Sequence, residues 1–340
     1  MAPTKLTDRG APEVVSHTHP RAPQLSRLHP VLRIVILVVL SLGINGALWQ
    51  FVSNFLDREL GAISKVPAED DLFSVYSPGA RLGLRVLTIW LTWFLSYDFY
   101  DVAALTVLTH MPFVYLITTF YNISNYTAAA HMNIEVLSVA IPTYLLRKRS
   151  DAHDASKALR NRFLLSSFQV QWSSTLLAAG VYVTVVWVGL RSGQLTNLLV
   201  SYFDVPTLLK AHSETPVTIA GKLATMSYAA KEFLLNPSIA AQPKSGAATP
   251  EEVFDASTAT LPQTVKHNVW YFSRRTRTLI QQTAIANAFV FVNTAQKAMT
   301  IKDTEVLGAL GYAGVWVFAN SLIALWYVWV GDSSADYEPL

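Results

Sequence analysis

Long apolar runs with few charges recur along the chain and alternate with short polar segments. They cover residues 34–52, 82–97, 102–121, 128–146, 170–190, 278–296 and 306–330. A helix needs about 20 predominantly apolar residues to cross the hydrocarbon core of a bilayer, and most of these runs have that length. The pattern predicts an all-α fold, namely a polytopic integral membrane helical bundle with seven to eight transmembrane segments.

The number of crossings depends on residues 191–277. If this stretch were a single loop, the basic cluster at 274–277 would lie across the membrane from the basic loop at 147–162, although Lys and Arg favour the cytosolic side. A further crossing would remove the conflict, and residues 195–211 are the only candidate. Because an Asp and a Pro interrupt them, we expect a discontinuous or re-entrant helix there. We expect a polar loop at about 212–277.

The flanking segments indicate the orientation. Residues 1–33 carry five basic and two acidic side chains with little apolar content, which predicts a disordered basic cytosolic tail. The run 34–52 lacks a small-residue cleavage site and is expected to remain as a signal anchor. Residues 34–330 then form a multi-pass membrane domain, and 331–340 form a short acidic tail. We expect the endoplasmic reticulum or another endomembrane, with the N-terminus in the cytosol.

The composition supports the membrane assignment and excludes several kinds of site. Only 14% of the 340 residues are charged and 51% are hydrophobic, whereas soluble domains carry about 25% charged residues. The absence of cysteine excludes disulfides, iron–sulfur clusters, thiolate zinc sites and cysteine nucleophiles. The sequence contains no phosphate-binding glycine loop and no nucleophile elbow, and nothing in it indicates nucleic-acid binding. We expect no cofactor, and a membrane lipid or hydrophobic small molecule as partner.

The apolar runs at 102–121 and 128–146 contain ionisable residues, although a charge costs about 2.5–3.5 kcal/mol at the centre of a membrane helix. His110 lies in one run, and His131 and Glu135 lie four residues apart on one face of the next. In antiparallel neighbours, His110 and Glu135 would lie within about one helical turn in depth, so we expect them to meet. A carboxyl in apolar surroundings is a candidate proton donor that either histidine could reload. The alternative is a polar bridge that fixes two helices, and the spacing does not favour a metal site.

Asp98 and Asp101 form a second acidic pair between two apolar runs. Paired carboxylates at a membrane rim could share a proton, bind a cation or hold the magnesium of a diphosphate. A turn between helices would also explain both residues, and the chain lacks the further acids of an aspartate-rich diphosphate site.

These residues suggest an intramembrane enzyme that acts on a hydrophobic small molecule or lipid. The carboxyl of Glu135, or else of Asp98 or Asp101, would protonate an alkene or epoxide, and aromatic rings would stabilise the carbocation. The aromatic residues expected around this pocket are Trp90, Trp93, Tyr97, Tyr115 and Tyr144. The chemistry is proton-initiated isoprenoid cyclisation, as in a terpene cyclase, and it requires neither metal nor cofactor.

Two other functions are compatible with the same residues. A non-enzymatic organiser or assembly subunit of an endomembrane would use the buried polar groups only to hold helices together. A proton-coupled carrier would use the Glu–His pair for transport, although the sequence shows no internal repeat between its halves.

Overall fold

The computed structural model describes residues 29–66, 77–157, 159, 162–241, 260–261, 264 and 274–332. Most of the N-terminal tail, most of the acidic tail at 331–340 and residues 242–259 of the expected polar loop lie outside the described residues. Within the described ranges the chain is helical, with a single isolated antiparallel bridge between Ser64 and Ile301 and no strand. The all-α prediction is confirmed.

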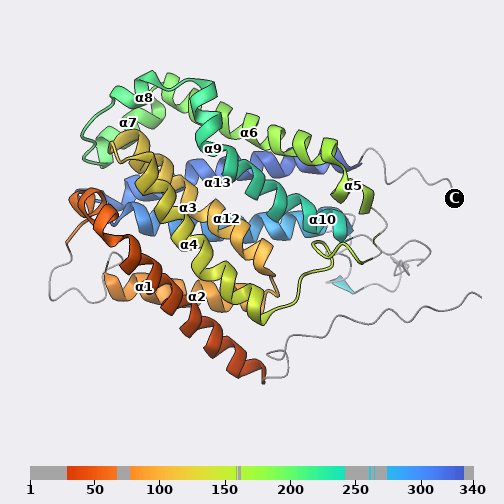
Figure 1. The fold of residues 1–340 in the computed structure, drawn as a ribbon. Coiled ribbons are helices and arrows are strands. Elements are labelled where there is room, and N and C mark those ends of the chain that lie inside the picture. Colours follow the sequence, from red (N-terminus) through yellow and green to blue (C-terminus); the bar gives the residue numbers. More distant parts are fainter. Residues whose placement is uncertain are drawn as a thin grey trace, which may run out of the picture.

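Seven long helices, together with α9, build the bundle (Figure 1). The long helices are α1 (Pro30–Ile63), α2 (Pro78–Phe94), α3 (Phe99–Phe120), α4 (Asn125–Leu146), α6 (Phe168–Arg191), α12 (Arg274–Ala298) and α13 (Val306–Asp332). The shorter elements are α5 (Arg162–Ser166), α7 (Gln194–Tyr202), α8 (Leu209–Ser213), α9 (Pro216–Ala230), the π-helical turn η2 (Lys231–Leu235) and α10 (Asn236–Ala240).

Four of the helices are long and apolar enough to cross a membrane. These segments are Val31–Ser53, Phe99–Phe120, Phe168–Arg191 and Val306–Trp329. The chain therefore has the character of a helical membrane protein. The runs expected at 82–97, 128–146 and 278–296 also form helices. Of these, α2 is shorter, with 17 residues, whereas α4 and α12 have 22 and 25 residues but are less apolar than the four segments above.

The segment expected as a polar loop at about 212–277 begins with a long helical stretch. Residues 216–240 run without interruption through α9, η2 and α10, and this helical stretch packs along α6 and α3. Its apolar side chains Ile219, Leu223 and Phe233 are fully buried in the main core. The segment 195–211 is broken, as predicted, into α7 and α8. At about 1.5 Å per residue, the nine residues of α7 are too short to cross a bilayer.

Backbone caps fix where the helices start. Asp98 begins α3 through a capping box, in which its Oδ1 accepts from the amides of Tyr100 and Asp101 while the Asp101 side chain accepts from the Asp98 amide. Ser124 caps α4 by accepting from the Thr127 amide. Asp98 thus has the turn role considered for it, and its second oxygen is left for other partners.

Contacts between helix termini show which termini lie together at each of the two ends of the bundle. At the α7/α8 end, on the left of Figure 1, the Ser124 amide donates to Glu59 and the Glu305 amide donates to the Tyr202 carbonyl. At the α5/α10 end, on the right, His153 from the loop after α4 meets the start of α3 and the turn η2. Successive long segments run in alternate directions between these ends.

Close helix packing explains the glycines of α13. A Cβ on Gly308 would lie 2.2 Å from Cβ of Tyr202, and one on Gly311 would lie 3.0 Å from a methyl carbon of Leu198, both on α7. Gly314, by contrast, has no such atom within 4 Å. The first two glycines therefore form a packing face that α7 covers.

Candidate functional site

A cavity of about 470 Å³ lies between α1, α2, α3, α4 and α12. This volume falls in the range of small-molecule pockets, about 300–1,000 Å³. Its charged and imidazole-bearing lining residues are Arg81, Arg85, His110, His131, Glu135 and Lys297. Three of these, His110, His131 and Glu135, were predicted from the sequence as site residues.

Glu135 is the centre of this charged group. Its Oε2 accepts a hydrogen bond from Arg85 Nη1 at 2.8 Å and lies 3.6 Å from His110 Nε2, while its Oε1 lies 3.7 Å from Lys297 Nζ. His131 joins through its Nε2, 3.2 Å from Lys297 Nζ. The predicted meeting of His110 and Glu135 is confirmed.

The surroundings of Glu135 differ from the apolar ones expected of it. Two cations lie within 3.7 Å of its carboxylate, and nearby positive charge favours the ionised form. The side chains of Glu135, Arg85 and Lys297 are only 13%, 18% and 17% exposed. Glu135 is therefore a paired carboxylate and does not have the environment of an isolated, protonated acid.

The pairing leaves polar atoms without partners. Among the described residues, no group forms a hydrogen bond with Nε of Arg85 or Nδ1 of His131, although both atoms are buried. Buried polar atoms are rarely left unsatisfied, because each costs about 1–3 kcal/mol. Both residues line the cavity, so a ligand with polar groups could form hydrogen bonds with these two atoms.

Helix α2 supplies one polar wall of the cavity. Arg81, Arg85, Thr88 and Thr92 recur at intervals of four, three and four residues, so they share one helical face, and all four line the cavity. The other side of α2 exposes large apolar side chains, namely Leu82, Leu87, Trp90 and Phe94. The four-three-four spacing of these polar residues was a sequence signal for a polar helix face, and it was overlooked because 82–97 is apolar on average.

Polarity changes along the cavity. Near the α7/α8 end, its lining includes Arg81 and Lys297 together with residues from the end of α1. Toward the other end of α2 and α3, the lining consists of uncharged residues, among them Ile89, Val102 and Leu105 with Thr92 and Thr106. The charged groups thus gather in one part of the cavity, and this arrangement suits a molecule with a charged head group and a less polar remainder.

The aromatic side chains expected around a pocket do not line this cavity. Trp90 and Tyr144 are 45% and 55% exposed on the outside of the bundle, and Trp93 lies under the guanidinium of Arg147. Tyr97 donates to Gln282 Oε1 at 2.8 Å, and Tyr115 is buried against Trp316. The two aromatic residues that do line it are Trp49 and Phe113.

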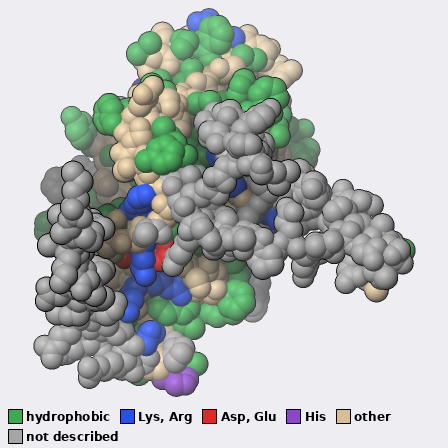
Figure 2. Space-filling view, turned by 90° about the vertical axis from the view of Figure 1, so that its right-hand side faces the viewer, with side chains coloured by type: hydrophobic (Ala, Val, Ile, Leu, Met, Phe, Trp, Pro, Cys, Tyr) green, Lys and Arg blue, Asp and Glu red, His purple; other side chains and the backbone are tan. Residues whose placement is uncertain are grey.

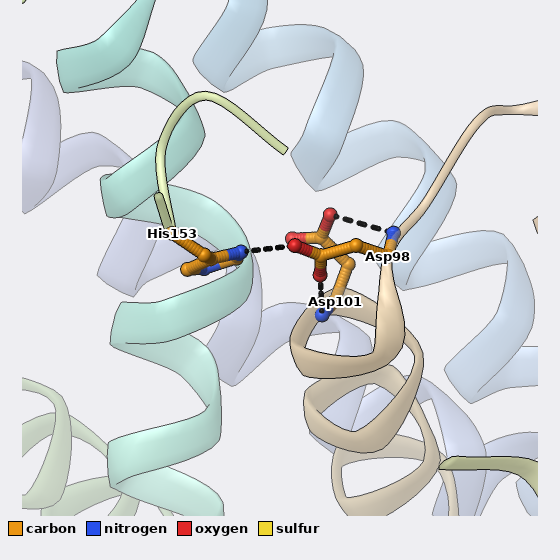
Figure 3. A group of neighbouring side chains, drawn as sticks. All are labelled: Asp98, Asp101 and His153. Atoms are coloured by element: carbon orange, nitrogen blue, oxygen red, sulfur yellow. Dashed lines mark hydrogen bonds and ion pairs between the residues drawn. The ribbon is translucent and has the colours of Figure 1, made fainter. Parts of the chain in front are cut away.

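Asp98 and Asp101 belong to a second cluster, with His153 (Figure 3). Nδ1 of His153 lies 2.8 Å from Asp98 Oδ2, which also accepts from the Ser150 amide at 2.9 Å. Burial alone would lower the pKa of His153, but its hydrogen bond to Asp98, the Glu232 carboxylate near its other ring nitrogen and the negative charges of Asp98 and Asp101 raise it to about 9. Burial likewise opposes ionisation of Asp98, but the bond to His153 and its charge outweigh that effect and lower the Asp98 pKa.

The turn η2 completes this second cluster. Glu232 Oε2 lies 3.7 Å from His153 Nε2, and Glu232 Oε1 accepts from the buried ammonium of Lys231 at 2.5 Å. Lys231 also donates to Gln171, and Asn236 donates to Glu232. The π-helical geometry, which is often found at functional positions, directs these side chains toward the loop that carries His153. No local sequence pattern marks His153 or Glu232 as a site residue. Each lies far from Asp98 in the sequence, His153 in the loop after α4 and Glu232 on η2, and only the fold brings them together.

Comparisons with protein-family models, with curated proteins and with solved structures found no match for this chain. The function is therefore argued from the geometry of the cavity and of its charged lining.

Proposed function

We propose that this protein holds an amphipathic molecule inside the membrane, a lipid or hydrophobic small molecule with an anionic head group. The observation that carries the proposal is the charge of the cavity lining, where the cations of Arg81, Arg85 and Lys297 outnumber the single carboxylate of Glu135. With neutral histidines the lining carries two more positive than negative charges. Excess charge inside a membrane protein is costly, and a bound anion would offset it.

The cavity suits the two parts of such a ligand. A carboxylate or phosphate can accept hydrogen bonds from guanidinium groups, and Arg85 has an Nε that no described residue uses. An apolar tail would extend toward Ile89, Val102 and Leu105. The exposed start of α2, at Pro78 and Arg81, provides a way in from the surface of the bundle.

We propose eight crossings of the membrane. The four apolar helices are joined by α2, α4 and α12, whose polar faces line the cavity, and by the helical stretch 216–240. This stretch, rather than 195–211, returns the chain to the side where α12 begins. The scheme places the basic cluster at 274–277 with the basic loop after α4, on the cytosolic side by the positive-inside rule. Lys and Arg side chains are visible on that end in Figure 2.

Proton-transfer catalysis is a second candidate, favoured by His110 and His131 beside Glu135 in the cavity. An imidazole within 3.6 Å of a carboxylate can exchange protons with it or with a bound ligand. Isoprenoid cyclisation stays a prediction within this class. The ion pairs of Glu135 and the position of the expected aromatic residues give it no support, so the wider proposal does not depend on it.

The test uses a fluorescent amphiphile and its neutral analogue. Purified full-length protein in nanodiscs is titrated with dansyl-undecanoic acid and with the methyl ester of the same probe. We expect saturable binding of the acid at least tenfold tighter than that of the ester, because hydrogen bonds to charged groups contribute about 1.5–3 kcal/mol. Replacing Arg81 by Gln should weaken binding of the acid up to about fivefold, since an exposed charge contributes less than about 1 kcal/mol.

Lys210→Gln is the matched control, because Lys210 lies at the same end but outside the cavity. Equal affinity for acid and ester, or an equal effect of both variants, would overturn the proposal.

Mass spectrometry of lipid extracts from cells with and without the protein then separates the alternatives. An accumulated precursor supports an enzyme, whereas unchanged lipids and no saturable probe binding favour an organiser. Probe-dependent proton flux in liposomes would indicate a carrier.

A further inference from the structure

The cluster of Asp98, Asp101 and His153 is not used by the proposed function. One ligand atom from each of the three side chains lies within 4.8 Å of the others. The two aspartates come from the first turn of α3, and His153 comes from the loop that follows α4. Figure 3 shows the two carboxyl groups side by side, with the imidazole directed at them from the opposite side.

The surrounding backbone holds these groups in place. Asp98 caps α3, and the Ser150 amide fixes its second oxygen at 2.9 Å. The ring of Tyr100 lies 4.8 Å from the imidazole of His153 and limits its rotation. The three side chains therefore have defined positions before any ligand binds, which lowers the cost of binding.

Two atoms of the cluster have no hydrogen-bond partner among the described residues. They are Oδ1 of Asp101, which lies within the cluster, and Nε2 of His153, which lies on the other side of the ring, 3.7 Å from Glu232 Oε2. Asp101 is only 6% exposed and the His153 side chain only 7% exposed, so water does not freely solvate either atom. A buried carboxylate oxygen without a donor is expensive, and it lies beside a second carboxylate. A cation bound by this oxygen, by Asp98 and by Nδ1 of His153 in place of its proton would offset that cost.

We propose that Asp98, Asp101 and His153 form a binding site for a divalent transition-metal ion, Mn²⁺ or Zn²⁺. Carboxylate oxygens suit Mn²⁺ and imidazole nitrogen suits Zn²⁺, and both ions accept a mixed set of two oxygens and one nitrogen. Mg²⁺ fits less well, because it prefers an all-oxygen, octahedral set. The sequence allowed a cation at Asp98 and Asp101 as one alternative, but it predicted no metal site and gave no sign of His153 as a third ligand.

Neighbouring charges are compatible with the ion. Glu232, whose Oε2 lies 3.7 Å from His153 Nε2, is placed to orient the imidazole from the side opposite the aspartates. Lys231 is neutralised by Glu232, and Arg147 is directed at the carbonyls of Trp93 and Tyr97. Binding would release the proton between Asp98 and His153, because a ligating imidazole is neutral.

The test measures Mn²⁺ bound to full-length protein that has been treated with a chelator in detergent and then freed of it. Electron paramagnetic resonance should detect one bound Mn²⁺ per chain, and Zn²⁺ should displace it. Electron spin-echo modulation should show coupling to a ¹⁴N nucleus, and ¹⁵N-labelled histidine should change that coupling. Absence of tightly bound Mn²⁺ and Zn²⁺, or bound Mn²⁺ without histidine coupling, would overturn the proposal.

Variants locate the ion within the chain. Asp101→Asn and His153→Gln should each weaken Mn²⁺ binding at least tenfold, and His153→Gln should also abolish the nitrogen coupling. Asp154→Asn is the matched control, since its carboxylate is next to His153 but faces Ser156. Binding that is unchanged in Asp101→Asn, or reduced equally in the control, would contradict the assignment. If Asp101→Asn does not fold, the labelled-histidine measurement on the unaltered protein decides. Either result leaves the cavity proposal untouched, because the two sites share no residue.

Discussion

Replacing Glu135 by Gln should lower the stability of this protein and strengthen its binding of an anionic amphiphile. The carboxylate lies within 3.7 Å of both Arg85 and Lys297. Without it, these two cations lose their counter-charge inside the bundle. Leaving a fully buried charge unpaired costs about 3–5 kcal/mol of stability. Because the three side chains are 13–18% exposed, solvent screens part of this cost, and we expect Glu135→Gln to lower the free energy of unfolding by about 2–3 kcal/mol.

The effect on binding has the opposite sign. A head group in the cavity is repelled by Glu135 and attracted by the two cations, so removing the carboxylate should tighten binding of dansyl-undecanoic acid about tenfold. The bound acid then replaces the lost counter-charge. At a concentration 100 times its Kd, a ligand contributes about 2.7 kcal/mol of stability, which would restore most of the loss.

Chemical unfolding followed by tryptophan fluorescence, with and without the acid, measures both effects in one sample. Glu214→Gln is the control, because Glu214 pairs with Lys222 at similar burial but outside the cavity. Glu214→Gln should lower stability without changing probe affinity. The reasoning is refuted if Glu135→Gln is as stable as the unaltered protein, or if it binds the acid no more tightly than the unaltered protein does.

Two further predictions concern packing and charge elsewhere in the bundle. Gly308→Ala should lower the free energy of unfolding by about 1–3 kcal/mol, because its Cβ would lie 2.2 Å from Cβ of Tyr202. Gly314→Ala meets no such atom within 4 Å, so its stability should be unchanged or slightly higher. Equal unfolding midpoints for the two variants would contradict the α7–α13 contact. In chelator, the raised pKa of His153, about 9 against about 6.5 in an unfolded chain, should give stability that is complete below pH 6.5 and is lost as the pH rises through 9. The loss corresponds to about 3 kcal/mol between pH 6 and 10. Unfolding measured at both pH values should show this loss in the unaltered protein and not in His153→Gln, and equal losses would exclude His153 as its source.

The cavity shows how far single helices could be predicted. The meeting of His110 with Glu135 followed from depth along neighbouring helices, because the rise per residue is constant. The partners Arg85 and Lys297 were missed, since each lies on a different helix whose rotation is set by packing. A polar stripe from Arg81 to Thr92 was present as a signal, but the overall apolarity of the run concealed it.

The sequence alone determined that the chain is helical and belongs in a membrane, because apolar run length and charge distribution act locally and add along the chain. It also placed costly ionisable groups at defined depths. Tertiary structure decided their chemistry, since protonation and ligand binding depend on which charges come within a few ångströms of a group. Glu135 changed from an isolated acid to a paired carboxylate when α2 and α12 packed against α4. Asp98 and Asp101 gained His153 from a loop that follows α4 and is 55 residues away from Asp98 in the sequence, a contact that no local pattern encodes.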